Sequence, residues 1–247
     1  GFQDELAPNK IRNYFLVNNE ESGEDRYKLL LTEQDKITII RVLDSMEESL
    51  TEPSIRIMEN FVLFQKHIAE SGISVGQIFE GINRLMLVSV ALEKDHDNPQ
   101  LIFESMNSTG KDLSQADLIR NYILMDLHPD EQTRLYTQYW RPMEQRFGQQ
   151  GYTDNFDWFM RDFLTTQNTS GRICKISEVY ETFKSHHKEC INNEELLKGL
   201  YAYSKYYTAI HLGKEVDADL KKLWAQLRTL DVSVSYPFLM RVYNDYE

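Results

Sequence analysis

Apolar residues recur at helical spacing along most of the chain, and this pattern predicts a mainly α-helical protein. The clearest stripe follows Pro53 and consists of Ile57, Phe61, Phe64 and Ile68, which lie on one face of a helix. The same periodicity, with a proline or a capping residue such as Ser74 at the start, predicts further helices. Their expected ranges are 8–15, 32–45, 74–84, 130–147, 154–166, 177–190, 193–212, 218–230 and 236–247.

Two short segments depart from this pattern and predict a minor β element. Tyr27–Leu31 is short and β-like and is expected to pair with Tyr14–Val17 as a hairpin. Leu85–Leu92, with the sequence LMLVSVAL, is apolar on both faces, which is typical of a buried strand. A lone buried strand needs partners, so we expect sheet-forming sequence outside this chain. The alternative is one continuous buried helix over Ile78–Leu92.

We therefore expect a multi-helix bundle in two lobes. The glycines at Gly148–Gly151 mark the boundary between them. The first lobe, residues 1–148, holds the short strands near 27–31 and 85–92 and an Asn-Ser-Thr-Gly turn. The second lobe, residues 149–247, is a C-terminal helical bundle with short connections.

The most informative stretch is Leu101–Leu127, which predicts a helix, a glycine turn and a second helix. Gly110 can adopt the positive φ that ends a helix or a tight turn. Ser114 has the properties of an N-cap, and Asp117, three residues later, is its acidic partner in the first turn. Arg120 follows Asp117 on the same helical face, so an acid and a base lie close together.

Two interpretations of this motif stay open. In the functional one, it completes a nucleotide pocket or the interface that transmits the nucleotide state. A helix start after a glycine turn offers free N–H groups to an anion, and an arginine can hold a phosphate through two hydrogen bonds. The residues of this candidate site are Asn107, Gly110, Lys111, Asp117, Arg120 and Asn121. In the structural interpretation, Asn107 caps the turn and Asp117 completes the helix cap, while Arg120 pairs with Asp117 or Glu104.

The chain carries a formal net charge of −12, from 27 basic and 39 acidic residues. That balance argues against tight nucleic-acid binding by this chain alone, since phosphate neutralisation needs clustered lysine and arginine. A local basic face within an acidic whole stays open for the intact protein. The candidate DNA-contacting residues are Arg134, Arg141 and Arg146, which lie among Tyr136, Tyr139 and Trp140. The alternative is a solvated helix face with the aromatic rings turned inward.

Catalytic and metal-binding arrangements are not evident, and we expect neither. His186 and His187 are adjacent and point about 100° apart on a helix, whereas zinc-binding helices use the i, i+4 spacing. A GxSxG nucleophile motif does not occur. Cys174 and Cys190 match no metal-ligand spacing and are interpreted as reduced thiols.

The motif FESMNSTGKDLSQADLIRNY at residues 103–122 resembles a motif of the GmrSD-type modification-dependent restriction endonucleases. Three further stretches are similar to the same family, at residues 9–35, 135–147 and 156–165. On this resemblance the chain corresponds to the helical middle of the family, with residues 1–148 as the C-terminal part of its N-terminal domain. The family's Asp-Gly-Gln-Gln-Arg nucleotidase motif and its paired-histidine HNH nuclease are not visible in the sequence.

The resemblance implies nucleotide-dependent cleavage of modified foreign DNA by the intact protein in the bacterial cytoplasm. It implies a nucleotidase domain before this chain and a nuclease domain after it as partners, with DNA as the substrate. GTP or ATP with Mg would serve the intact protein, and no cofactor is expected in this chain. We therefore expect a non-catalytic scaffold and relay that is inactive alone.

A membrane role is not expected, because the longest apolar run, Leu85–Leu92, is far shorter than the about 20 residues of a membrane span. A homo-oligomer stays open. Two other function classes stay open as well: a helical protein–protein interaction module with an acidic, aromatic-rich surface, and a self-contained enzyme. The first predicts an exposed apolar patch on the C-terminal bundle, and the second a deep pocket with perturbed titratable groups.

Overall fold

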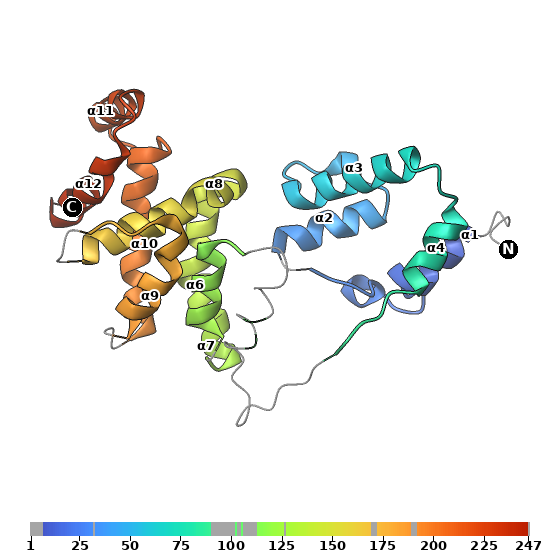
Figure 1. Ribbon diagram of the computed structural model, residues 1–247. Helices are drawn as coiled ribbons and strands as arrows, with labels where there is room; N and C mark the ends of the chain where they lie inside the picture. The colour runs from blue at the N-terminus through green and yellow to red at the C-terminus, as the bar shows by residue number, and fades with distance from the viewer. Residues whose placement is uncertain are drawn as a thin grey trace. The chain divides into compact units, whose positions relative to one another are not determined.

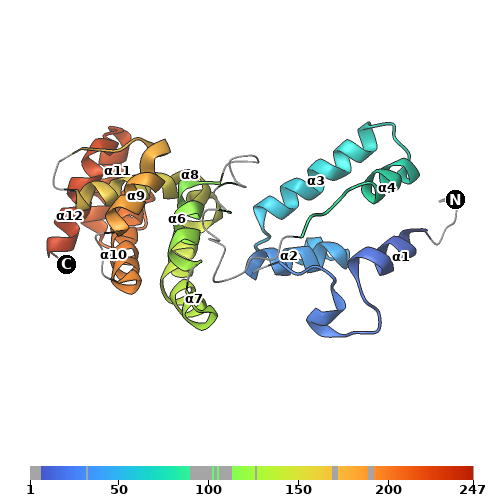
Figure 2. The same ribbon diagram turned by 60° about the horizontal axis from the view of Figure 1, so that its bottom comes forward.

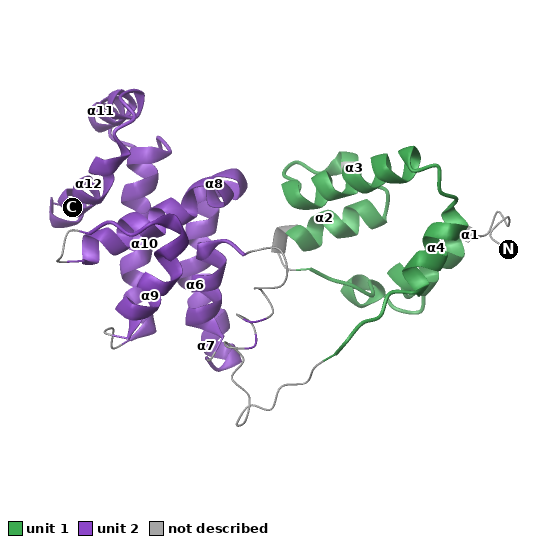
Figure 3. Cartoon of the chain, in the orientation of Figure 1, with its two compact units in different colours: residues 1–90 green, residues 91–247 purple. Residues whose placement is uncertain are grey.

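The computed structural model describes residues 7–31, 33–89, 102, 105, 113–125, 127–168, 172–188 and 192–246. The chain divides into two compact units, residues 1–90 and residues 91–247 (Figure 3). Every regular element in the described ranges is a helix, so the mainly α-helical fold predicted from the sequence is confirmed (Figure 1). None of the helices in these ranges is both long enough and apolar enough to cross a membrane.

Unit 1 consists of short and medium helices. α1 spans Ala7–Ile11 and continues as a π-helical turn, η1, at Arg12–Leu16. The later elements are η2 (Gly23–Arg26), α2 (Glu33–Leu43), η3 (Glu47–Ser49), α3 (Ile55–Glu70) and α4 (Val75–Asn83). α2 packs against α3.

Serine side chains define where α3 and α4 begin. The hydroxyl of Ser54 accepts the N–H of Ile57. Ser74 accepts the N–H of Gln77, and the Gln77 side chain accepts the N–H of Ser74 in return. Ser74 is thus the cap that the sequence predicted, and the side chains of Ser74 and Gln77 together satisfy two N–H groups at the helix start.

The β elements predicted for unit 1 do not form as expected. The hairpin is reduced to a single antiparallel bridge between Val17 and Tyr27. The prediction of a strand at Leu85–Leu92 is wrong for residues 85–89, the part that the structure describes, because these residues form no regular element and are exposed. The continuous helix over Ile78–Leu92 is wrong as well, since α4 does not extend into this segment. The physical reason is that no sheet among the described residues offers pairing partners.

Unit 2 is a bundle built around one long helix. Its elements are α6 (Gln115–Leu124), α7 (Pro129–Leu135), the π-helical turn η4 (Tyr136–Trp140), α8 (Arg141–Gln167), η5 (Ile176–Glu178), α9 (Val179–His187), α10 (Asn193–His211), α11 (Ala218–Thr229), η6 (Ser233–Ser235) and α12 (Tyr236–Tyr246). α8 packs against α10 and α12, and α6 packs against α8 and α9 (Figures 1 and 2).

The interval expected as a domain boundary lies inside unit 2. Gly148 has φ 75° and ψ 166°, which interrupts α8. Phe147 before it stacks on Tyr207 of α10, and Phe156 after it packs on Phe147 with the ring centroids 4.8 Å apart. This interval is therefore a kink within one packed unit. The division into domains 1–148 and 149–247 stays a prediction.

Candidate functional site

The start of α6 is where the polar residues of the predicted motif meet the rest of unit 2. The hydroxyl of Ser114 accepts the N–H of Asp117 at 3.1 Å and donates to the Asp117 carboxylate at 2.9 Å. Ser114 is therefore the N-cap that the sequence predicted. Asp117 contacts the hydroxyl of Ser114, whereas a capping box uses the backbone N–H of the cap residue.

Asp157, which comes from α8, completes this helix start. Its two carboxylate oxygens accept the N–H groups of Gln115 at 3.1 Å and Ala116 at 2.8 Å. Burial raises the pKa of Asp157, while these two hydrogen bonds act in the opposite direction and the charge of Asp117 adds to the rise. The N–H groups that were expected to receive an anion thus already bind a carboxylate of the same chain.

Arg120 lies one turn further along α6 and is held by two carboxylates. Its guanidinium contacts Asp117 at 3.2 Å and Glu144, from α8, at 3.1 Å. The other oxygen of Glu144 accepts the hydroxyl of Tyr136 at 2.9 Å. Burial disfavours the charged guanidinium, but Tyr152, Asp117 and Glu144 outweigh it and raise the pKa of Arg120. The side chain is accordingly a permanent cation that is paired within the protein.

Tyr152, which follows the kink of α8, closes this group. Its hydroxyl donates to Asp117 at 3.5 Å and accepts the indole N–H of Trp140 at 3.4 Å. Burial is the main cause that raises the pKa of Tyr152, and the charge of Asp117 adds to it. The phenol is therefore neutral at physiological pH. We name this group the Arg120 network, and its members are Asp117, Arg120, Tyr136, Glu144 and Tyr152.

The Arg120 network is suited to holding helices together rather than to catalysis. Both of its carboxylates already contact a guanidinium and a hydroxyl, so neither is placed as an unengaged general base. Partly buried ionic groups that are fully hydrogen-bonded restrain the elements that carry them. The network therefore restrains α6 relative to α8 and η4.

The structure brings together two residues of the predicted site. Asp117 and Arg120 form an ion pair, as the structural interpretation of the motif predicted. Asn121 follows on α6 and is half-buried. Outside the described residues lie Asn107, Gly110 and Lys111, as does Glu104. The nucleotide-binding role of this motif stays a prediction.

Sequence reasoning missed three residues that complete this region, namely Gln115, Glu144 and Asp157. The side-chain oxygen of Gln115 accepts the N–H of Tyr180 at 2.9 Å, which ties α6 to the start of α9. Glu144 is 24 residues from Arg120 in the sequence, and Gln115 is 65 residues from Tyr180. A local pattern cannot identify partners at such separations.

Arg134 and Arg146, which were expected to contact DNA, bind groups within the chain. Arg134 forms a two-pronged ion pair with Glu194 of α10, at 3.1 and 2.9 Å. Tyr139 donates to the same carboxylate at 2.9 Å. Arg134 and Tyr139 together hold the pKa of Glu194 down at about 2. The guanidinium of Arg146 lies over the ring of Tyr201, 5.7 Å from its centroid.

The third arginine, Arg141, begins α8 and is half-buried. Tyr139 and Trp140, just before it, are buried, so these rings turn inward as the alternative interpretation predicted. Contact between DNA and the three arginines stays a prediction for the intact protein.

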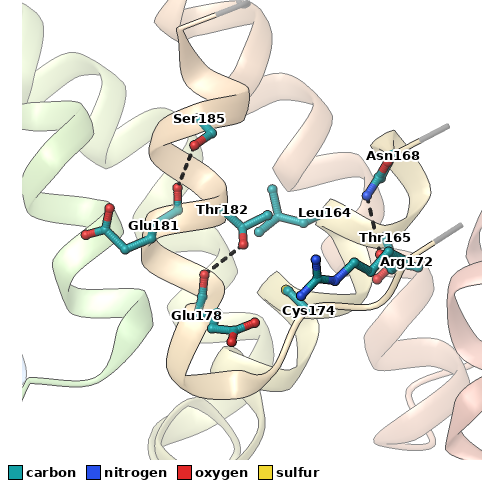
Figure 4. A pocket seen from close by; sticks show the side chains of 9 residues that line it. All are labelled: Leu164, Thr165, Asn168, Arg172, Cys174, Glu178, Glu181, Thr182 and Ser185. Atoms are coloured by element: carbon teal, nitrogen blue, oxygen red, sulfur yellow. Dashed lines mark hydrogen bonds between the residues drawn. The ribbon is translucent and has the colours of Figure 1, made fainter. Parts of the chain in front are cut away.

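A cavity of about 350 Å³ lies between the end of α8 and α9 (Figure 4). Its lining residues are Leu164, Thr165, Asn168, Arg172, Cys174, Glu178, Glu181, Thr182 and Ser185. Thr182 and Ser185 donate their hydroxyls to backbone carbonyls four residues earlier, so these hydroxyls serve the helix. The surface of the lining is as polar as it is apolar, whereas most small-molecule sites are lined predominantly by apolar side chains. Its walls come from separate segments, which is why no sequence motif predicted it.

Metal ligands do not gather in the part of the chain that the structure describes. Groups of three or more His, Cys, Asp or Glu side chains that could hold a metal ion are absent from it.

Residues 5–124 match the family described as GmrSD restriction endonuclease, N-terminal domain. The matched region, just under half of the chain, belongs to this family. The GmrSD match corrects one expectation, because the resemblance placed the chain in the family's middle region and the match is to the N-terminal domain. It ends at Leu124, the last residue of α6, and α6 belongs to unit 2. No curated protein and no solved structure matches the chain.

Proposed function

We propose that this chain is the helical relay of a GmrSD-type restriction protein that cleaves modified foreign DNA in a nucleotide-dependent reaction. In this proposal the chain catalyses no step itself. Hydrolysis of GTP or ATP with Mg and cleavage of DNA are carried out by partner domains in the cytoplasm. The chain transmits the nucleotide state between them.

One observation carries this proposal. α6 is the last element of the GmrSD match, and its Ile119 and Ile123 are buried in the same cluster as the side chains of α8, α9 and α10. Asp157 and Glu144, both from α8, bind the start and the middle of α6. A shift of α6 would therefore displace α8 as well, since packed and ion-paired elements move together or not at all.

The relay is tested in the intact restriction system by separating its two activities. Glu144→Gln removes the charge that binds Arg120 while it keeps the shape of the side chain. We expect nucleotide hydrolysis to continue and nucleotide-dependent cleavage of modified DNA to fall at least roughly fivefold, the lower end of typical coupling energies. Glu195→Gln, an exposed acid on α10, is the matched control and should leave both activities unchanged.

Two results would contradict the relay. If Glu144→Gln lowers hydrolysis and cleavage equally, the network supports stability or nucleotide binding rather than coupling. Nuclease activity of the purified chain on its own would show that it is an enzyme.

The nucleotide-binding part of the motif has a separate test. Titration calorimetry of the purified chain with GTP and with ATP, each with Mg, is compared for the wild type and the double variant Asn107→Ala, Arg120→Ala. Binding that the variant loses would place part of the nucleotide site in this motif. Absence of binding to a folded chain would make the motif architectural, and the relay proposal would then rest on α6 alone.

A second candidate function, a protein-interaction module, is supported by apolar side chains on the C-terminal helices. Leu223 and Leu230 of the α11 region and Phe238 of α12 are 54%, 71% and 69% exposed. Exposed apolar patches commonly mark binding surfaces. Phe238→Ser with Leu230→Ser should abolish restriction in cells if this surface is the essential one. Loss of restriction in this variant, with Glu144→Gln fully active, would favour the interaction module over the relay.

A further inference from the structure

Four cations gather in unit 2 where α8 and α10 pack against each other (Figures 1 and 2). The guanidinium of Arg146 lies 5.7 Å from the ring centroid of Tyr201, and the ammonium group of Lys205 lies 4.9 Å from the same centroid. The ammonium group of Lys214 donates to the backbone carbonyl of Arg146. Lys198 precedes Tyr201 by three residues and therefore shares its face of α10. We name Arg146, Lys198, Lys205 and Lys214 the basic face.

The basic face lacks carboxylate partners. Among the described residues, none of its four cations forms an ion pair with an aspartate or a glutamate. Glu194, one turn before Lys198 on α10, binds Arg134 instead. Arg120 and Arg161 of the same unit are also paired with carboxylates. Cations without such partners are a local exception in a chain whose net charge is −12.

Arg146 in particular keeps its hydrogen-bond donors unused. A guanidinium has five N–H donors. Within the described part of the chain, neither the buried Nε atom of Arg146 nor its terminal nitrogens donate a hydrogen bond. The guanidinium is nevertheless held in place by the ring of Tyr201, which packs edge-on against Tyr139 with the centroids 6.4 Å apart. An anion from outside the chain would therefore meet a cation that is already positioned.

The extent of the basic face indicates a partner with several anionic groups. Lys198 and Lys205 are seven residues apart, which corresponds to on the order of 10 Å along α10. A single phosphate or carboxylate group cannot contact cations over such a distance. Arg146 and Lys214 extend the face further, from α8 and from the loop after α10. The basic face thus fits an extended polyanion.

The surroundings of the basic face are polar. Large apolar side chains are not exposed in the described residues of α7, η4 and α10, nor in residues 141–147 of α8. Exposed residues on these elements include Gln138 and Gln145. Membrane-binding helices place apolar side chains beside their cations, and the centre of a protein interface is commonly apolar. These features favour the phosphates of a nucleic acid over a membrane or a protein partner.

The aromatic residue of this region is not placed to read bases. Single-stranded nucleic acids stack their bases on open aromatic rings. The ring of Tyr201 is instead contacted by Arg146, Lys205 and Tyr139. Contacts to phosphates position a protein on DNA and carry no direct sequence information.

We propose that the basic face binds the phosphate backbone of the substrate DNA and reads neither its bases nor their modification. This proposal rests on the proposed function, which makes DNA the substrate of the intact protein. It changes the set of expected contacts, because Arg134 is neutralised by Glu194, whereas Arg146 acts together with the three lysines. Recognition of the modified base then belongs to another surface of the intact protein.

Direct binding of DNA to the purified chain tests this proposal. Fluorescence anisotropy is measured with a short labelled duplex, once unmodified and once with methylated cytosines. We expect a Kd on the order of 10⁻⁵ M at about 50 mM salt, and a roughly hundredfold weaker affinity at about 200 mM, as four phosphate contacts require. The two duplexes should bind equally well.

Two double variants separate the basic face from the overall charge. Lys198→Gln with Lys205→Gln removes two exposed cations of the face. It should weaken binding at least roughly tenfold and reduce the slope of log affinity against log salt by about 2. Lys221→Gln with Lys222→Gln removes the same charge from exposed positions of α11 and should leave affinity and slope unchanged. An equal loss in both double variants would overturn the proposal.

Other outcomes would also overturn it. Absence of DNA binding by the folded chain at about 50 mM salt would exclude the basic face as a DNA surface. Tighter binding to polyglutamate or to phosphatidylserine vesicles than to DNA would identify a different class of partner. Tighter binding to the methylated duplex would show that bases are read. The relay fails by a separate measurement, in which Glu144→Gln lowers nucleotide hydrolysis and DNA cleavage equally.

Discussion

Asp157 is the residue that changes the interpretation of the α6 motif most. A helix start attracts anions because its first N–H groups lack partners within the helix. Here the carboxylate of Asp157 accepts two of those groups, and the hydroxyl of Ser114 accepts a third. An anionic ligand would therefore have to displace a half-buried side chain of the chain itself. At the scale of single residues, the motif connects α6 to α8 through hydrogen bonds within the chain.

Removing this carboxylate should destabilise the protein. Asp157→Ala leaves the N–H groups of Gln115 and Ala116 without an acceptor, which costs about 1–3 kcal/mol for a buried group. Asp157→Asn should cost less, because its amide oxygen can still accept one of them. Urea unfolding followed by circular dichroism measures both variants. Asp154→Asn, at an exposed position of the same helix, serves as the control. An unchanged unfolding midpoint in Asp157→Ala would contradict the stabilising role of the Asp157 hydrogen bonds to α6.

Asp162 gives the stability of the protein a pH dependence. It is 1% exposed, and Arg161 donates two hydrogen bonds to one of its oxygens. Burial raises the pKa of Asp162 to about 6, although the charge of Arg161 opposes the rise. An acid with a raised pKa binds its proton more tightly in the folded state. Its contribution is therefore most favourable below about pH 4 and is lost as the pH rises through 6.

The unfolding free energy of the wild type minus that of Asp162→Asn should fall by up to about 3 kcal/mol from pH 4 to pH 7. Above pH 7 this difference should stay constant. Denaturant unfolding at each pH measures it. A flat profile for Asp162→Asn would mean that its folded-state pKa is ordinary.

At the scale of elements, α8 is a long helix that is interrupted by a kink. The sequence predicted two helices separated by glycines, and the structure contains one long element with a kink at Gly148. Aromatic residues on both sides of the kink enter one core, since Phe147 and Phe156 contact each other. Gly148 has φ 75° and ψ 166°, a conformation that is essentially restricted to glycine. The kink allows both halves of α8 to contact α10.

Two glycine-to-alanine substitutions should have opposite effects. Gly148→Ala meets no atom within 4 Å but is strained by its backbone conformation, so it should lower the unfolding free energy by about 1–3 kcal/mol. Gly199→Ala lies within α10, with open space and no positive φ, and should raise it by about 0.5–1 kcal/mol. Thermal and urea unfolding of the pair provide the measurement. Equal effects would show that the conformation at Gly148 is not required.

The helix α3 illustrates the opposite outcome. Its predicted apolar stripe is present on one face, but Phe64 and Ile68 are 66% and 47% exposed. An apolar stripe in the sequence predicts that one face of a helix is buried. The stripe does not tell which element covers that face. Among the described residues, α3 has no buried side chain.

At the scale of the whole molecule, burial is distributed very unevenly between the two units. The fully buried aromatic and aliphatic side chains, such as Trp140, Phe156 and Leu197, form one cluster in unit 2. In the described part of unit 1, the buried side chains are those of Val17, Thr38 and Ser54. Unit 2 therefore has a core of its own, and unit 1 has little apolar surface removed from water.

This difference predicts two levels of stability in one chain. Backbone amides in α8 and α10 should exchange with solvent at least roughly a hundredfold more slowly than those in α3 and α4, because local opening costs more where more apolar surface is buried. Hydrogen–deuterium exchange of the isolated chain, read peptide by peptide, measures this ratio. Limited proteolysis should cut unit 1 first. Equal protection of the two units would contradict the difference in burial.

The sequence by itself determined the helical fold, the caps at Ser74 and Ser114 and the GmrSD family. These features are local, because helix periodicity and capping depend on residues within about four positions of each other. It also predicted that Asp117 and Arg120 share a face.

Only the tertiary structure decided the partners of those residues. Glu144 and Asp157 reach α6 because the chain folds back through η4 and α8, and such long-range contacts leave no local signal. The structure adopted by the segment at residues 85–89 was decided in the same way. Its two-sided apolar pattern predicted a buried strand, but a strand is stable only when another strand pairs with it, and the described residues contain none.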